Sequence, residues 1–224
     1  GFAGPFRPLP SLALGAQEVT PLELATAYGT LANGGIRVEP RIIKMVVNAE
    51  GEILTAPRGQ GTRAVSATSA YLVNTVLQGV MTRGTGKSSR WLGYRGNAAG
   101  KTGTTDDTRD AWFVGYTPSI LALTWVGYDD NARTGLTGAS GALPIWVDFT
   151  KRAGLDDHVS FDRPRDVIRV AVDPETGMRA VAGCPGGRAE LFAAGTEPRA
   201  DCPLHKRGFF KRLFSRKNKK RDPV

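Results

Sequence analysis

Apolar residues recur at helical spacing in two parts of the chain. The run Thr20-Pro21-Leu22-Glu23 combines a capping box with a proline suited to a first helical turn. The apolar face that follows comprises Leu22, Ala25, Tyr28 and Leu31, and Asn33-Gly34-Gly35 ends it. A second helix, capped by Ser66 or Ser69, runs to about Met81 with apolar positions at Leu72, Val73, Val76, Leu77 and Val80. We therefore predict helices over residues 20–35 and 66–81.

Alternating or β-branched apolar residues predict strands elsewhere. Three strands follow one another at 97–105, 111–116 and 120–127, and Thr117-Pro118-Ser119 forms the turn between the last two. A hairpin is expected from 36–47 and 52–54 around a turn at 48–51, and a short strand at 11–15. Residues 55–63 are rich in Pro and Gly and are expected to be a connector.

A closing helix is predicted after Ser140-Gly141. Pro144 belongs in its first turn and Gly154 ends it, so that Leu143, Trp146 and either Val147 or Phe149 are buried across the sheet. These elements indicate an α+β fold in which helices flank an antiparallel sheet. Beyond Asp156 the pattern changes to a strand at 161–172, a turn at 173–177 and short apolar pieces. We therefore expect three parts: 1–157 as the main domain, 158–205 as a small β-rich unit and 206–224 as a tail.

The charge of the chain is concentrated at its end. The whole chain carries a net charge of +9, but residues 206–221 hold nine Lys or Arg and no acid, so the remainder has 21 basic and 21 acidic groups. A neutral body gives no support for a nucleic-acid-binding face. The tail is interpreted as a disordered basic end, with contact to anionic lipid or wall polymer as the alternative.

Two cysteines, Cys184 and Cys202, lie 18 positions apart in the loop-rich segment. They could pair as a disulfide in an oxidising compartment or remain two small apolar residues in a reducing one. Only His205 is near them in the chain, which fits no zinc pattern, so we expect no metal. No cofactor is expected either.

The candidate chemistry lies in Gly100-Lys101-Thr102-Gly103-Thr104-Thr105, on the edge of a predicted hairpin. The lysine supplies a positive charge, the hydroxyl of Thr102 can hold a carboxylate, and Gly103 allows a ligand to approach the strand closely. The backbone N–H of Thr104 can point at a developing oxyanion. A second glycine-rich run, Gly84–Ser89, lacks the first glycine of a phosphate-binding loop and follows a helix, so we interpret it as a turn.

The longer run AGKTGTTDDTRDAWFVGYTP resembles the Lys-Thr-Gly region of the transpeptidase domain of class A penicillin-binding proteins. The string SLALGAQEVTPLELATAYGTLANGG resembles the helix that follows the second active-site motif of that family. The resemblance covers residues 11–155 and implies the fold shared with serine β-lactamases. It implies that Lys101 and Thr104 act in catalysis and that Lys101, Thr102, Gly103 and Thr104 bind substrate. The implied partners are peptidoglycan stem peptides and β-lactams.

The chain departs from that family in one respect. None of its serines is followed by Lys three positions later or by Asn two positions later, so the nucleophile motif Ser-x-x-Lys and the relay motif Ser-x-Asn are absent. We expect both motifs, the N-terminal strand of the sheet, a membrane anchor and a glycosyltransferase domain upstream, and an inactive fragment here. The expected location is the periplasm or the outer face of the cytoplasmic membrane. The alternatives are a serine β-lactamase-like hydrolase and a non-catalytic module that binds peptidoglycan or another protein.

Overall fold

A computed structural model describes residues 1–2, 4–56, 59–155 and 158–205. The chain forms two compact units, which we call unit one (Gly1–Pro164) and unit two (from Arg165 onward). The basic tail predicted over 206–224 lies outside the described residues.

Unit one is built around an antiparallel sheet of three strands, β5 (Ala99–Thr104), β6 (Ala111–Tyr116) and β7 (Leu121–Val126), in that spatial order. The register pairs Lys101 with Val114 and continues from Val114 to Leu123. The predicted strands are confirmed here with slightly shorter ends. β5 therefore has β6 on one side only, which makes it an edge strand within the described residues.

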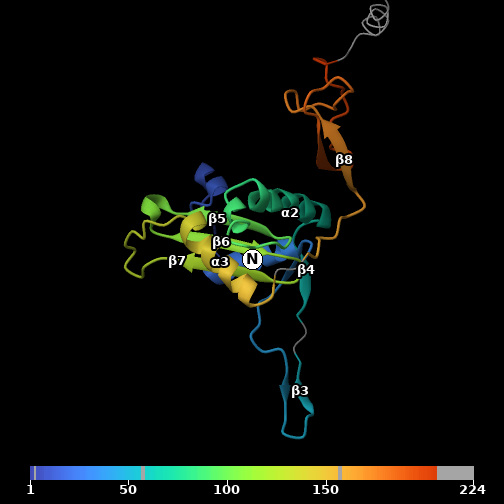
Figure 1. The fold of residues 1–224 in the computed structure, drawn as a ribbon. Coiled ribbons are helices and arrows are strands. Elements are labelled where there is room, and N and C mark those ends of the chain that lie inside the picture. The colour runs from blue at the N-terminus through green and yellow to red at the C-terminus, as the bar shows by residue number, and fades with distance from the viewer. Residues whose placement is uncertain (3, 57–58, 156–157, 206–224) are drawn as a thin grey trace, which may run out of the picture. The chain divides into compact units, whose positions relative to one another are not determined.

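Helices cover both faces of this sheet. α1 (Pro21–Ala32) and α2 (Ala67–Thr82) surround a cluster that includes Val114 and Tyr116, whereas α3 (Leu143–Arg152) packs on Phe113 from the opposite face. Figure 1 shows α2 on the β5 side of the sheet. The capping box at Thr20 and the cap at Ser66 are both formed as predicted. Of the two alternatives for the closing helix, Val147 is buried and Phe149 is 48% exposed.

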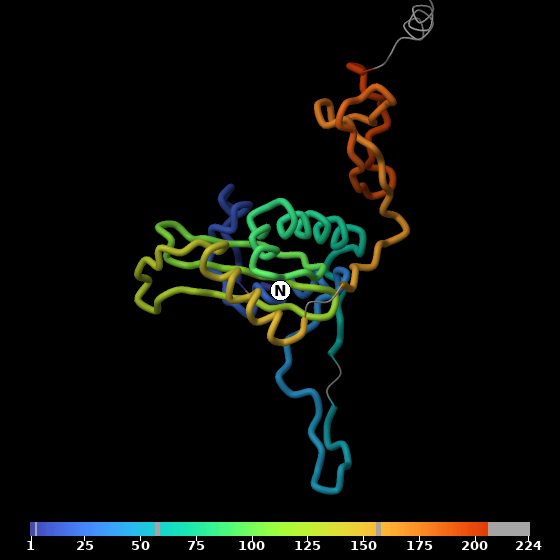
Figure 2. The backbone as a smooth tube through the Cα atoms, viewed as in Figure 1, coloured from blue at the N-terminus to red at the C-terminus, as the bar shows by residue number. Residues whose placement is uncertain are grey.

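The hairpin predicted from 36–47 and 52–54 is correct only at its tip. β2 (Val46–Val47) pairs with β3 (Ile53–Thr55) around the predicted turn, but β1 (Ile36–Val38) pairs instead with β4 (Gly61–Arg63). The long first strand is interrupted near Pro40, since proline has no N–H for a ladder. The supposed connector therefore contains a strand. Figure 2 shows the exposed β2–β3 hairpin reaching away from the sheet.

The short strand predicted at 11–15 is wrong. Pro10–Leu14 forms a 3-10 helix, with Gly15 in the left-handed region at φ 74° as its C-terminal cap. A proline at the first helical position and a glycine directly after the last one are the signals that the apolar pattern of the segment concealed.

Short 3-10 or π segments connect the main elements of unit one. These are η2 (Lys87–Ser89), η3 (Asp106–Thr108) and η4 (Gly138–Ala142), the last of which runs directly into α3. The glycine-rich run Gly84–Ser89 follows α2. Its first half is a turn, as predicted, and its second half is η2. Among the described residues, the helices are too short or too polar to span a bilayer.

Unit two contains a hairpin of β8 (Val167–Val172) and β9 (Arg188–Ala193), paired along their full lengths. Isolated bridges join Arg179 to Val172 and to Asp201, so the segments before and after β9 are tied to each other. The α+β class with a β-rich extension is thus confirmed.

Candidate functional site

The residues singled out from the sequence lie together on β5. Lys101, Thr102, Gly103 and Thr104 pair in order with Val114, Phe113, Trp112 and Ala111 of β6. Because successive side chains of a strand point to opposite faces, Lys101 leaves β5 on the Val114 face and the two threonines leave it on the Phe113 face. Because β5 is an edge strand, side chains on either face of the sheet lie next to its unpaired side.

The direction of the Thr104 amide follows from the ladder. Thr105 N donates to Asp110 O across the turn between β5 and β6 at 3.1 Å. In an antiparallel pair, alternate residues turn their N–H groups toward the neighbouring strand, so the N–H of Thr104 is directed away from β6. Thr104 is exposed, and its amide therefore faces the open side of the strand. This is the orientation that an oxyanion donor needs.

The ammonium group of Lys101 lies along the same edge. Its Nζ donates to the carbonyl oxygen of Thr102 at 2.7 Å, and the side chain is exposed. The hydroxyl of Thr102 is 2.7 Å from the hydroxyl of Thr85, which belongs to the turn after α2. A positive charge and a hydroxyl pair thus lie within one stretch of strand edge, where they can receive an anionic group.

The end of β5 is supported by η4. Gly138 N donates to Oγ1 of Thr104 at 3.0 Å. A side chain at Gly138 would overlap the carbonyl oxygens of Trp112 and Gly103, so only glycine permits this close approach. Since the Thr104 hydroxyl accepts this bond, it keeps its own hydrogen to donate to a ligand.

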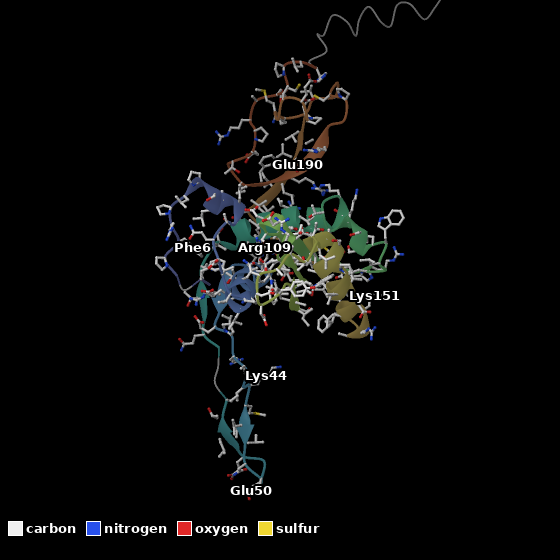
Figure 3. All side chains as sticks on the ribbon, turned by 90° about the vertical axis from the view of Figure 1, so that its left-hand side faces the viewer. Phe6, Lys44, Glu50, Arg109, Lys151 and Glu190 are labelled. Carbon is white, nitrogen blue, oxygen red and sulfur yellow. The ribbon has the colours of Figure 1, made fainter. Side chains whose placement is uncertain are left out.

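Asp110 anchors the turn that follows the motif. Its carboxylate accepts hydrogen bonds from Thr105 Oγ1 and Trp125 Nε1, both at 2.9 Å. These two bonds give Asp110 a structural role, in which it holds the end of the strand. Arg109, labelled in Figure 3, donates to the carbonyl of Asn131 at 2.6 Å.

The strand edge is an open surface. A hollow of about 620 Å³ lies elsewhere in unit one, between the N-terminal segment and the start of α1, and β5 contributes nothing to its lining. Along this edge Lys101 and Thr104 are exposed, whereas Thr102 and Gly103 are half-buried.

Two supporting residues were missed from the sequence. Thr85 lies 17 positions before its partner Thr102, and Gly138 lies 34 positions after its partner Thr104. Neither separation along the sequence corresponds to the periodicity of a helix or a strand. The glycines on either side of Thr85 predict a turn there, but they give no sign that its hydroxyl contacts Thr102. Contacts of this kind depend on tertiary folding.

The two cysteines are in unit two, away from the motif in the chain. Both are free thiols, Cys202 fully buried and Cys184 partly buried. A disulfide between them stays a prediction.

Family models match most of the chain. Residues 7–140 match the model described as penicillin binding protein transpeptidase domain. Residues 163–207 match the model described as penicillin-binding protein 1A, C-terminal domain. The two matches fall largely within unit one and unit two, respectively.

Similar sequences and structures carry related names. Penicillin-binding protein 1A of Aquifex aeolicus is 37% identical over 199 residues, which cover 88% of this chain and 27% of the relative. Penicillin-binding protein 1B of Escherichia coli is 35% identical, over 87% of this chain and 22% of the relative. The crystal structure of penicillin-binding protein 1A from Haemophilus influenzae has a TM-score of 0.77 and 29% identity, over 86% of this chain and 34% of that one. The chain thus spans about a quarter of the length of these curated relatives.

Proposed function

Because this chain belongs to the penicillin-binding protein transpeptidase family, we propose that it forms one wall of an acyl-transfer site that cross-links peptidoglycan. The reaction is a serine-type transpeptidation of D-Ala-D-Ala stem peptides in the complete protein. The observation that carries the proposal is the edge of β5, where neighbouring residues bear the Lys101 ammonium, the Thr102 hydroxyl and the outward amide of Thr104.

Each group has a role that follows from its chemistry. Lys101 supplies a fixed positive charge for the carboxylate of the substrate, and the hydroxyl of Thr102 donates a hydrogen bond to that carboxylate. The amide of Thr104 donates to the oxygen that becomes negative when the carbonyl is attacked. The Thr104 amide thereby stabilises charge that develops at the reacting centre, and Lys101 adds a fixed positive charge beside that centre. Gly103 keeps the strand narrow enough for a peptide to lie beside it.

The attacking serine must come from sequence beyond these 224 residues. No serine of the chain has the Ser-x-x-Lys or Ser-x-Asn spacing. We therefore place the nucleophile and its base in the remaining sequence of the complete protein. The resemblance to class A penicillin-binding proteins implies a membrane anchor and a glycosyltransferase domain there as well. The chain alone would bind substrate weakly and form no acyl-enzyme.

The proposed ligands are stem peptides and β-lactams. A structure of penicillin-binding protein A from Mycobacterium tuberculosis is described as a ceftriaxone acyl-enzyme complex, and it shares 26% identity and a TM-score of 0.52 with this chain. A β-lactam presents a carboxylate and a reactive carbonyl, which the Lys101 charge and the Thr104 amide can accommodate. Since stem peptides are cross-linked outside the cytoplasmic membrane, we place the site in the periplasm or on the outer face of that membrane.

The test uses the complete protein and a fluorescent penicillin. Lys101→Ala is expected to slow the rate of covalent labelling by about 100-fold or more, because a charge at the reacting centre is lost. The control is Lys44→Ala, an exposed lysine of the segment that leads to the β2–β3 hairpin (Figure 3), which should label at the normal rate. Equal labelling of the Lys101 variant and the wild type would remove this residue from the site.

The same preparation separates the two alternatives. A transpeptidase retains the penicilloyl group for a long time and joins stem peptides, whereas a β-lactamase-like hydrolase releases it rapidly. A protein that neither labels nor cross-links, but binds peptidoglycan, would favour the non-catalytic module.

A further inference from the structure

Four side chains of unit two, remote in the chain from the β5 motif, meet at one point. They are Asp173, Cys184, Cys202 and His205, and their nearest ligand atoms all lie within 4.8 Å of one another. Asp173 begins the turn after β8, Cys184 precedes β9, and the other two follow β9. Two thiols, an imidazole and a carboxylate are all metal-binding groups.

The backbone of unit two brings these segments together. Asp173 N donates to Met178 O at 2.8 Å, which closes the turn after β8. Arg179 N then donates to Ala200 O at 3.0 Å, and Cys202 N donates to Arg179 O at 2.9 Å. The segment after β9 is thereby held beside the turn, with Cys202 next to Asp173. These are backbone bonds, so the cluster is positioned by the fold of the unit.

The distances suit a tetrahedral ion. The nitrogen Nδ1 of His205 is 3.3 Å from Sγ of Cys202 and 3.1 Å from Oδ2 of Asp173. Around a tetrahedral zinc ion with bonds of about 2.0–2.3 Å, neighbouring ligand atoms are roughly 3.3–3.8 Å apart. The two distances from His205 are close to this spacing, and the remaining ligand atoms lie within 4.8 Å of one another. His205 also follows Cys202 by three positions, which lets the two side chains of one turn reach one ion.

The buried carboxylate is an independent observation. Asp173 is completely buried, and its Oδ1 accepts bonds from the amides of Glu175 and Thr176 and from the Thr176 hydroxyl at 3.0–3.1 Å. Its Oδ2 is equally buried, faces His205 and accepts no hydrogen bond of good geometry within the described part of the chain. A buried carboxylate oxygen without such a partner is costly unless a cation neutralises it.

We propose that Asp173, Cys184, Cys202 and His205 bind one zinc-class divalent transition metal ion. Thiolate and imidazole ligands favour such an ion over magnesium or calcium. Four protein ligands fill a tetrahedron and leave no position for substrate, so the site is structural. It ties the turn after β8 to both flanks of β9.

This proposal replaces the expectation that the chain binds no metal. That expectation rested on linear spacing, which showed only His205 near the cysteines and gave no reason to include Asp173, 11 positions before Cys184. It is also an alternative to the predicted disulfide, since oxidation would remove both thiolates. A disulfide accounts for neither the buried Oδ2 of Asp173 nor the approach of His205.

In the first experiment, zinc is added to the full 224-residue chain, whose thiols are kept reduced, in the presence of a competing chromophoric chelator. The absorbance of the chelator measures how much zinc the protein binds. One zinc per chain is expected, with both thiols then protected from a thiol-modifying reagent. Cobalt(II) in place of zinc should give the visible bands of a tetrahedral ion and a thiolate charge-transfer band.

The second experiment changes single ligands conservatively. Asp173→Asn and His205→Gln should each weaken zinc binding by about 100-fold while the cobalt charge-transfer band persists, and Cys202→Ser should also reduce that band. The control His158→Gln changes the other histidine of the chain, which lies in unit one, and should leave the affinity unchanged.

Two results would overturn the proposal. One is a reduced wild-type chain that binds no stoichiometric zinc, in particular if the protein isolated from an oxidising compartment carries a Cys184–Cys202 disulfide. The other is zinc binding that both Asp173→Asn and His205→Gln leave unchanged. The titration of the wild-type chain tests the proposed zinc site even if a variant fails to fold. Neither result affects the rate of penicillin labelling, which tests the proposed function separately.

Discussion

At the scale of single residues, glycines determine how closely the layers of unit one approach. Gly115 of β6 lies directly under the indole of Trp146 from α3, and the indole N–H donates to the carbonyl oxygen of Gly115 at 3.2 Å. A side chain at this position would overlap the rings of Trp146 and Phe113. The close packing of α3 on the sheet therefore requires that residue 115 has no side chain.

Gly115→Ala is expected to lower the free energy of unfolding by about 1–3 kcal/mol, because a buried aromatic ring must move. Gly29→Ala is the matched control: Gly29 lies inside α1 with nothing within 4 Å of the added carbon. That variant should be more stable by roughly 0.5–1 kcal/mol, since alanine favours helix. Urea unfolding of both variants measures the difference, and a neutral Gly115→Ala would contradict the close packing.

At the scale of elements, β6 is held to α1 and α2 by one buried polar chain. The hydroxyl of Tyr116 donates to Oδ1 of Asn74 at 2.7 Å, and Nδ2 of Asn74 donates to the carbonyl oxygen of Leu31 at 2.9 Å. Asn74 is on α2 and Leu31 on α1, so three elements meet in these two bonds. Since β6 carries β5, this chain also helps to hold the motif strand in place.

Tyr116→Phe should lower stability by about 1–3 kcal/mol at neutral pH, because it leaves the buried amide oxygen of Asn74 without its donor. The exposed Tyr128 provides the control, and Tyr128→Phe should change stability by less than about 0.5 kcal/mol. Chemical denaturation measures both. Equal stabilities for the two variants would show that the buried chain contributes nothing.

The raised pKa of Tyr116 leads us to expect that the free energy of unfolding falls at alkaline pH. Burial, and next the charge of nearby Tyr28, raise the pKa of Tyr116 above its ordinary value of 10.0. A raised pKa in the folded state means that the folded chain holds the proton more tightly than the unfolded chain. This contribution is complete below about pH 10 and is lost progressively above it. Wild-type stability should fall more steeply over that window than the stability of Tyr116→Phe, as denaturation at several pH values would reveal.

At the scale of the whole molecule, the two units are separate compact bodies with different chemistry. All four tryptophans, at positions 91, 112, 125 and 146, belong to unit one, and both cysteines belong to unit two. Tryptophan fluorescence therefore reports on unit one alone. This distribution allows the metal site to be tested for its effect on each unit.

Removal of the proposed metal by a chelator should speed proteolytic cleavage within residues 165–205, because the ion ties the segments around β9 together. The unfolding midpoint reported by tryptophan fluorescence should stay the same. Protease mapping by mass spectrometry and a fluorescence melt measure the two effects. A midpoint that falls on chelation would mean that the units unfold as one body.

Local signals account for what was predicted correctly. The Thr20 capping box, the Ser66 cap and the alternation in 111–116 each act within a few residues, and α1, α2 and β6 follow them closely. The motif on β5 was also recognisable, since its residues are consecutive. Errors arose where local signals were ambiguous, as at Pro10–Leu14, or where a strand found a remote partner, as β1 did with β4.

The amino-acid order alone determined the helices, the central strands and the grouping of Lys101, Thr102 and Thr104, because these depend on periodicity, caps and neighbours along the backbone. Only the tertiary structure decided that Thr85 and Gly138 support the motif and that Asp173 joins Cys184, Cys202 and His205. Such contacts join segments 11 to 34 positions apart, and their proximity results from chain folding, which brings together residues that no local pattern relates.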